Sequence, residues 1–161
     1  MSLEPILSAP IVVQIHVCCA VSAAILGPIA LLRRSRDLWH RRVGTLWVAA
    51  MFLTAVSSFA ISDFPVFGRF SPIHLLSCLT FLGLWQGVVA ARRRDIARHQ
   101  REMRTLYFWA MGVAGLFTFL PERRMNRVFF DAAPQQGFAF AAVIIGAGLV
   151  WYSIQSRKAA R

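Results

Sequence analysis

The sequence predicts an all-α membrane protein with five transmembrane helices, four of which form a tandem-duplicated up-down-up-down bundle. Three observations lead to this fold. The 161-residue chain is 57% hydrophobic, with a mean hydropathy of +0.55, which is too apolar for an ordinary soluble domain. Several of its segments approach the length of a membrane span. In addition, two long stretches of the sequence resemble each other.

The candidate spans follow one another with short polar connections. A helix rises about 1.5 Å per residue, so about 20 apolar residues cross a hydrocarbon core of about 30 Å. Inside lipid every backbone amide and carbonyl needs an internal partner, so we expect these spans to be helices. The fourth span is short, and Arg104 would extend it by reaching the headgroups. The spans cover residues 11–32, 43–62, 72–91, 105–120 and 137–154.

The distribution of charge predicts how the chain is oriented. The net charge is +11, and most of the 18 Lys and Arg residues follow the first, third and fifth spans. The positive-inside rule places these segments in the cytoplasm, so the N-terminus would lie outside and the C-terminus inside. Because topology and attraction to anionic lipid account for the basic excess, we do not expect nucleic acid as a partner. The three cysteines fall inside apolar spans, where a thiol behaves as a small buried hydrophobe.

Each of the two similar stretches begins and ends with a histidine. The first runs from His16 to His40 and the second from His74 to His99, and these are all four histidines of the chain. Short connections make sequential helices antiparallel neighbours, and a parallel repeat implies a pseudo-two-fold axis along the membrane normal. Helices one and three are then diagonal, as are helices two and four. We expect a single membrane domain over 1–161, with repeats at about 11–62 and 72–120 and an extra helix at about 137–154.

The predicted axis places the histidines in pairs. His16 and His74 would lie at matching heights near the outer face, and His40 and His99 near the inner face. The gap between diagonal helices suits two imidazoles that approach one haem iron from opposite sides. The pattern suggests two stacked bis-histidine sites for haem b, as in the four-helix di-haem cytochromes b that this plan resembles.

Other residues would complete a haem site at the outer face. Arg69, Arg123 and Arg124 are the expected partners of the haem propionates. Small residues one to three turns after His16 leave room for the flat porphyrin ring of haem. Interhelical hydrogen bonding, which is the ordinary use of an intramembrane histidine, stays open as an alternative for His16 and His74.

The inner pair allows a second interpretation, because His40 and His99 lie outside the apolar spans. Asp37 precedes His40 by three residues and Asp95 precedes His99 by four, which puts carboxylate and imidazole on one helix face. These four side chains would suit Zn²⁺ or non-haem iron. The same aspartates would alternatively act as N-caps of helices that project beyond the membrane. A structural role in the loops is also open for both histidines.

Three functional hypotheses follow. The first is electron transfer by b-type haem between a membrane quinone and a partner. The second is a non-catalytic accessory or assembly subunit of a larger membrane complex, since the chain is small and has no acid–base or nucleophile constellation. The third is a metal site or transport role at the cytoplasmic Asp/His face. Whether the protein is an enzyme stays open.

Several ordered runs of residues resemble a known family. They are IHVCCAVSAAILGPIALL, HRRVGTLWV, FSPIHLLS, ARRRDIARHQREM and GLFTFLPERRM. The chain is similar over about residues 11–130 to a family of small bacterial membrane proteins, domain of unknown function 2306, and all four histidines fall on its characteristic positions. The resemblance implies a polytopic bundle in the bacterial inner membrane and contributes no activity. The family usually has a glycine where this chain has Glu122.

Overall fold

The computed structural model describes residues 2–33, 35–61, 72–130 and 132–143, and the regular secondary structure in these ranges is helical. The chain divides into two compact units. Unit 1 consists of Met1–Ser8 and Gly115–Arg161, and unit 2 of Ala9–Ala114.

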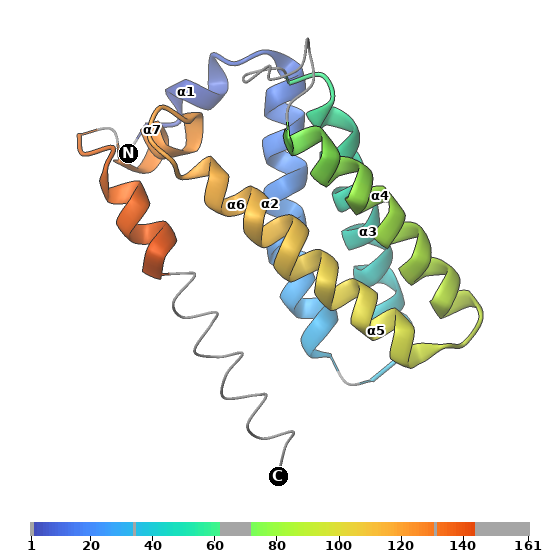
Figure 1. The fold of residues 1–161 in the computed structure, drawn as a ribbon. Helices are drawn as coiled ribbons and strands as arrows, with labels where there is room; N and C mark the ends of the chain where they lie inside the picture. The colour runs from blue at the N-terminus through green and yellow to red at the C-terminus, as the bar shows by residue number, and fades with distance from the viewer. Residues whose placement is uncertain (1, 34, 62–71, 131, 144–161) are drawn as a thin grey trace. The chain divides into compact units, whose positions relative to one another are not determined.

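Unit 2 is a bundle of four antiparallel helices (Figure 1). The first three are α2 (Ile11–Leu32), α3 (Leu38–Ser58) and α4 (Pro72–Arg92). The fourth helix runs without a break through α5 (Ile96–Thr105), the π-helical η1 (Leu106–Met111) and the start of α6 (Gly112–Thr118).

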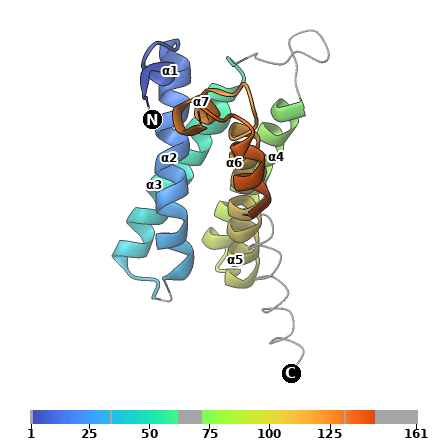
Figure 2. The same ribbon diagram turned by 90° about the vertical axis from the view of Figure 1, so that its left-hand side faces the viewer.

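The packing order of these helices agrees with the predicted up-down-up-down plan. Helix α2 packs on α3, α3 on α4, α4 on α5 and η1, and these two in turn on α2. Figure 2 shows the α2/α3 hairpin beside the hairpin of α4 and α5. It follows that α2 and α4 are diagonal to each other, as are α3 and the fourth helix.

The five predicted spans are confirmed only in part. Two helical segments of the described chain are long and apolar enough to cross a membrane, Ile11–Leu32 and His74–Arg92. Helix α3 has sufficient length, but Arg41 and Arg42 lower its hydropathy. The fourth helix is continuous, but its α-helical geometry changes to π-helical at Leu106–Met111, and none of its three segments alone has the length of a span. Of the predicted fifth span, only the helical residues up to 143 lie within the described chain.

Aspartates begin α3 and α5, as one of the predictions proposed. Asp37 Oδ1 accepts a hydrogen bond from the His40 amide at 3.0 Å, and Asp95 Oδ1 accepts one from the Arg98 amide at 3.1 Å. An N-cap satisfies amides that the first helical turn leaves open. Both helices therefore begin before the predicted apolar spans, at Leu38 and Ile96 rather than at 43 and 105.

A compact core fills the middle of the bundle. Small residues such as Gly27 and Gly83 let the helices approach closely. A Cβ atom at Gly27 would overlap the ring of Tyr107, and one at Gly83 would lie 2.7 Å from a methyl of Leu106. The core consists of Ala23, Trp47, Ala50, Met51, Leu84, Met103, Leu106 and Ala110.

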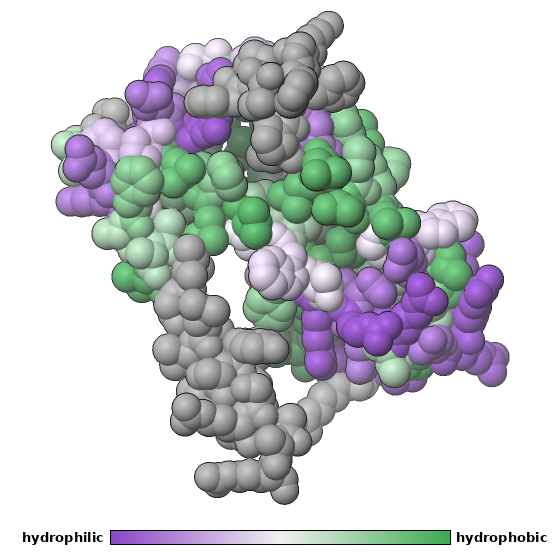
Figure 3. Space-filling view, in the orientation of Figure 1, coloured by the Kyte–Doolittle hydropathy of each residue, from purple (hydrophilic) through white to green (hydrophobic). Residues whose placement is uncertain are grey.

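The outer faces of the bundle are apolar. Figure 3 shows hydrophobic side chains over the middle of unit 2 and hydrophilic ones gathered around the start of α5. Large side chains such as Leu75 (65% exposed) and Trp85 (70% exposed) point outward. The expectation that the cysteines are buried is wrong for Cys18 and Cys78, which are exposed because they lie on these outward helix faces. An apolar outer surface suits contact with lipid.

Unit 1 contains the short helices α1 (Glu4–Leu7) and α7 (Arg124–Phe130), which pack against each other. Helix α7 follows the end of the predicted fourth span at residue 120. Glu122 precedes it with a φ of 70°. This left-handed conformation favours glycine, which is the residue that the resembled family usually has here.

Candidate functional site

One group of polar side chains lies where α2 begins, α3 ends and α4 begins. We call it the serine end, and it consists of His16, Ser57, Ser58, His74 and Ser77. His16 Nδ1 lies 2.9 Å from Ser57 Oγ. The Ser57 hydroxyl itself donates to the Leu53 carbonyl at 2.7 Å, so its oxygen accepts from Nδ1–H of His16. With Nδ1–H as the donor to Ser57, Nε2 is the unprotonated nitrogen of a neutral His16 ring.

His74 contacts the same end of α3. Its side chain is buried (4% exposed), and its ring packs against Phe59 with 5.3 Å between the ring centroids. One turn further along α4, Ser77 Oγ lies 2.6 Å from Ser58 Oγ. The last turn of α3 thus contacts α2 through Ser57 and α4 through Ser58. His16 and His74 accordingly lie at one end of the bundle, on diagonal helices.

The opposite end of the bundle carries the other two histidines. We call it the arginine end, after Arg33, Arg36, Arg41, Arg42, Arg92, Arg93, Arg94 and Arg98. Here His99 Nδ1 lies 2.9 Å from the Gly87 carbonyl of α4. Since a carbonyl only accepts, Nδ1 carries the proton and Nε2 is again the unprotonated nitrogen. His40 and His99 lie on diagonal helices, near the starts of α3 and α5.

Two nitrogens on α3 are buried without a hydrogen bond in the described chain, one at the arginine end and one in the core of the bundle. His40 Nδ1 and Trp47 Nε1 are buried and find no partner among the described residues. A buried polar atom without a partner costs free energy, about 1–3 kcal/mol for a typical group. Between them on the helix is Gly44, where a Cβ atom would meet no other atom within 4 Å.

Both aspartates of the alternative metal site have other roles. Asp37 caps α3 and is paired with Arg33, whose hydrogen bonds hold the pKa of the Asp37 carboxyl well below its usual range. Asp95 caps α5. Across the described ranges, no three His, Cys, Asp or Glu side chains group as metal ligands would. The structure therefore does not bring Asp37, His40, Asp95 and His99 together as a ligand set.

The predicted propionate partners are not tested by this geometry. Arg69 lies outside the described residues. Arg123 and Arg124 belong to unit 1, where Arg124 is the first residue of α7. Their link to the histidines stays a prediction.

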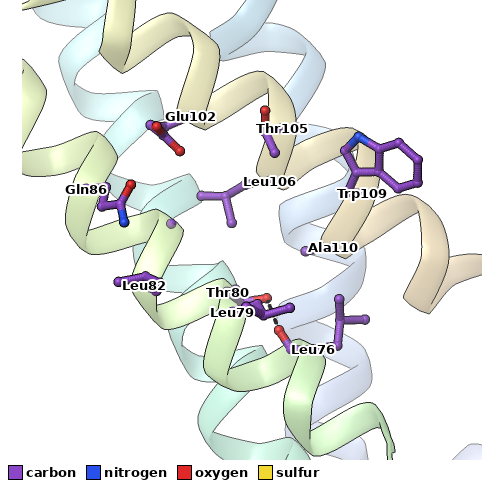
Figure 4. A pocket seen from close by; sticks show the side chains of 11 residues that line it. Leu76, Leu79, Thr80, Leu82, Gln86, Glu102, Thr105, Leu106, Trp109 and Ala110 are labelled. Carbon is purple, nitrogen blue, oxygen red and sulfur yellow. Dashed lines mark hydrogen bonds between the residues drawn. The ribbon is translucent and has the colours of Figure 1, made fainter.

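A groove that the sequence did not predict runs between α4 and the fourth helix (Figure 4). It has a volume of about 280 Å³. Leu79, Leu82 and Trp109 are among the side chains along its apolar length, and Gln86 and Glu102 lie at its polar end. Its wall includes part of η1, and π-helical turns occur frequently at functional sites.

The serines were not identified as functional from the sequence. Ser57, Ser58 and Ser77 lie in apolar spans, where a hydroxyl commonly bonds its own helix. Their position in the sequence is the feature that could have identified them. Two adjacent serines lie near the end of the second predicted span, on the side of the membrane where the predicted topology places His16 and His74.

Comparison with known proteins places the chain in a family. No curated protein and no solved structure matches the chain. Residues 13–151, which include all four histidines, match the family described as predicted membrane protein (DUF2306). The chain therefore belongs to the DUF2306 family of predicted membrane proteins, as its sequence motifs indicated.

Proposed function

We propose that this protein binds haem b between His16 and His74 and transfers electrons between a membrane quinone and a partner. The observation that carries the proposal is the placement of these two histidines at one end of the bundle, on diagonal helices. Neutral imidazole is a standard axial ligand of haem iron, and bundle cores commonly hold such cofactors.

The hydrogen bonds of the rings support this assignment. A histidine that binds a metal almost always donates its other ring N–H to a carboxylate, a carbonyl or water, which fixes the ring and its tautomer. His16 donates from Nδ1 to Ser57, and His99 donates from Nδ1 to the Gly87 carbonyl. In both rings Nε2 is the nitrogen with the lone pair that a metal requires.

A second haem between His40 and His99 at the arginine end is the weaker half of the proposal. It is supported by Nδ1 of His40, which is buried without a partner among the described residues, and by the open space beside Gly44. The Asp/His metal site has less support, because Asp37 and Asp95 serve as helix caps. Each hairpin begins with a helix that contains one histidine and continues into a second helix that is capped by an aspartate and also contains one histidine. This similarity fits a tandem duplication.

The charge distribution supports an orientation. The arginine end would face the cytoplasm of a bacterial inner membrane, with the N-terminus outside and the C-terminus inside. A reporter fused after the C-terminus should be active only in its cytoplasmic form. Activity of a periplasmic reporter at that position would contradict this orientation.

An optical spectrum tests the haem proposal. The full-length protein, purified in mild detergent from a haem-replete host, should show sharp α and Soret bands in a dithionite-reduced minus air-oxidised spectrum. We expect His74→Ala to remove the serine-end component and Leu75→Ala, at the exposed neighbouring position, to leave it unchanged.

A flat spectrum from well-folded protein would contradict haem binding. The alternative function would then be the non-catalytic subunit of a larger membrane complex. In that case the protein should co-purify with a stoichiometric partner.

A further inference from the structure

We infer that the groove between α4 and the fourth helix binds the head group and the adjoining chain of an isoprenoid quinone. This inference rests on the proposed electron-transfer function, because it gives the lipid-soluble partner of that function a binding site. It assigns the residues that contact the head group, which the histidine geometry alone does not provide.

The length of the groove suits a hydrocarbon chain. Leu79 and Leu82 of α4 line one side of it and Trp109 of η1 the other, and all three are at least half exposed on the apolar surface of the bundle. Sites for small ligands usually enclose about 300–1,000 Å³. At about 280 Å³, the groove would hold a ring and the start of its tail. The remainder of the tail would lie in the surrounding lipid.

The polar end of the groove offers both hydrogen-bond donors and hydrogen-bond acceptors. Gln86 extends from α4, and Glu102 and Thr105 extend from the fourth helix (Figure 4). Gln86 Oε1 accepts from Arg98 Nη2 at 3.5 Å, so the two amide hydrogens of Gln86 remain available as donors. A quinone oxygen would accept from the amide or from the Thr105 hydroxyl, and a hydroquinone hydroxyl would donate to Glu102.

Within the groove, the Glu102 carboxylate disfavours the phosphate of a phospholipid relative to a neutral head group. The Glu102 side chain is 18% exposed, and its Oε1 lies 4.0 Å from Arg98 Nε. Arg98 therefore already has contacts with Gln86 and Glu102. An anionic phosphate in the groove would meet the Glu102 carboxylate, and like charges in a partly buried site repel.

The polar end also adjoins one of the proposed haem ligands. Glu102 follows His99 by three residues on α5, which puts the two side chains on one helix face. Gly87, whose carbonyl accepts from His99, is the neighbour of Gln86 in the chain. A quinone head group between Gln86 and Glu102 would therefore lie beside the arginine-end histidine.

Direct binding tests this inference. Decyl-ubiquinone is titrated into the full-length protein in phosphatidylcholine nanodiscs, and quenching of tryptophan fluorescence is followed. We expect saturable quenching in the wild type. Thr105→Phe, which fills the polar end, should weaken binding at least about tenfold, or about 1.4 kcal/mol. Ile25→Phe, at an exposed position on α2 outside the groove, should bind like the wild type.

Glu102→Gln provides a second variant that keeps the shape of the groove. It should weaken binding of the reduced probe, decyl-ubiquinol, more than that of the oxidised probe, because only the reduced head group donates to the carboxylate. Equal affinity in the wild type and Thr105→Phe, or quenching that never saturates, would overturn the inference. Displacement of the probe by added phosphatidylglycerol would also overturn it, since it would show a phospholipid site.

The haem spectrum of the same samples separates this inference from the proposed function. Saturable binding to protein without haem bands would support the groove and contradict the haem. Haem bands with no saturable binding would support the haem and contradict the groove.

Discussion

The serine end and the arginine end of the bundle carry the same residues of interest, two histidines on diagonal helices, in opposite surroundings. At the serine end the histidines lie among hydroxyls within the helix contacts, and His74 is buried. At the arginine end they lie within the first turns of α3 and α5, among charged side chains and helix caps.

This difference shows how each end satisfies its polar groups. A buried polar group needs a partner inside the protein. The buried serines have one: Ser57 bonds His16, and Ser58 bonds Ser77. At the arginine end the charged groups are mostly exposed, while the buried Nδ1 of His40 has no partner among the described residues. The serine end is therefore ordered by its own contacts, and the arginine end has capacity for a further ligand.

The largest expected effect is the loss of haem from one end of the bundle when a histidine at that end is replaced. His16→Ala and His74→Ala should each remove the same haem component, because one iron needs both imidazoles. His40→Ala and His99→Ala should together define a second component. The measurement is haem per protein by the pyridine haemochrome assay, together with the reduced spectrum. If His16→Ala and His40→Ala removed the same component, the assignment of one pair to each end would be wrong.

The next effect tests the hydrogen bond that orients His16. Ser57→Ala removes the acceptor of His16 Nδ1–H and should weaken haem binding about 10–100-fold, the usual range for such supporting partners. Haem titration of the apo-protein measures this change. Ser22→Ala is the matched control, since within the described part of the chain the Ser22 hydroxyl bonds the Cys18 carbonyl of its own helix and no other group. A similar loss in both variants would mean that Ser57 has no specific role.

A smaller effect concerns the hydroxyl pair between α3 and α4. Ser58→Ala and Ser77→Ala should each lower the free energy of unfolding by about 1–3 kcal/mol, because each leaves a buried hydroxyl without this partner. The double variant should lose less than the sum, with a coupling of about 0.5–3 kcal/mol. Unfolding in mixed detergent micelles measures these values. Strictly additive losses would show that the two serines act independently.

The smallest effect is a pH dependence at the arginine end. Hydrogen bonds from Arg33 lower the pKa of Asp37, so the cap of α3 is fully formed above the ordinary aspartate pKa of about 3.9. It should be lost only as the pH falls through the lower value of the folded protein. Hydrogen exchange at the His40 amide would follow this loss. Arg33→Gln should move it to higher pH, and an unchanged midpoint would contradict the role of Arg33.

Length and hydropathy predicted the helices that are apolar throughout. The span predicted at 11–32 coincides with α2, and the span at 72–91 ends one residue before α4 does. The starts of α3 and α5 were placed too late, because their first turns are rich in arginine and are held by Asp37 and Asp95. The π-helical turn at Leu106–Met111 had no local signal, since it depends on packing against α4 and α2.

The candidate site was predictable in its histidines and not in its supporting contacts. The spacing of His16, His40, His74 and His99 was sufficient to pair them by end. The bond from His16 to Ser57 joins residues that are far apart in the sequence. The groove requires the register of α4 against the fourth helix. These features depend on tertiary packing, which periodicity in a single chain does not encode.

The measurement that tests the central claim most directly is near-infrared magnetic circular dichroism of the ferric protein, which reports the axial ligands of haem. We predict the bis-histidine signature in the wild type and its loss at the serine end in His16→Ala and in His74→Ala, with Leu75→Ala unchanged. A histidine–methionine or high-spin signature in the wild type would contradict the claim. So would a bis-histidine signature that survives both histidine substitutions in full.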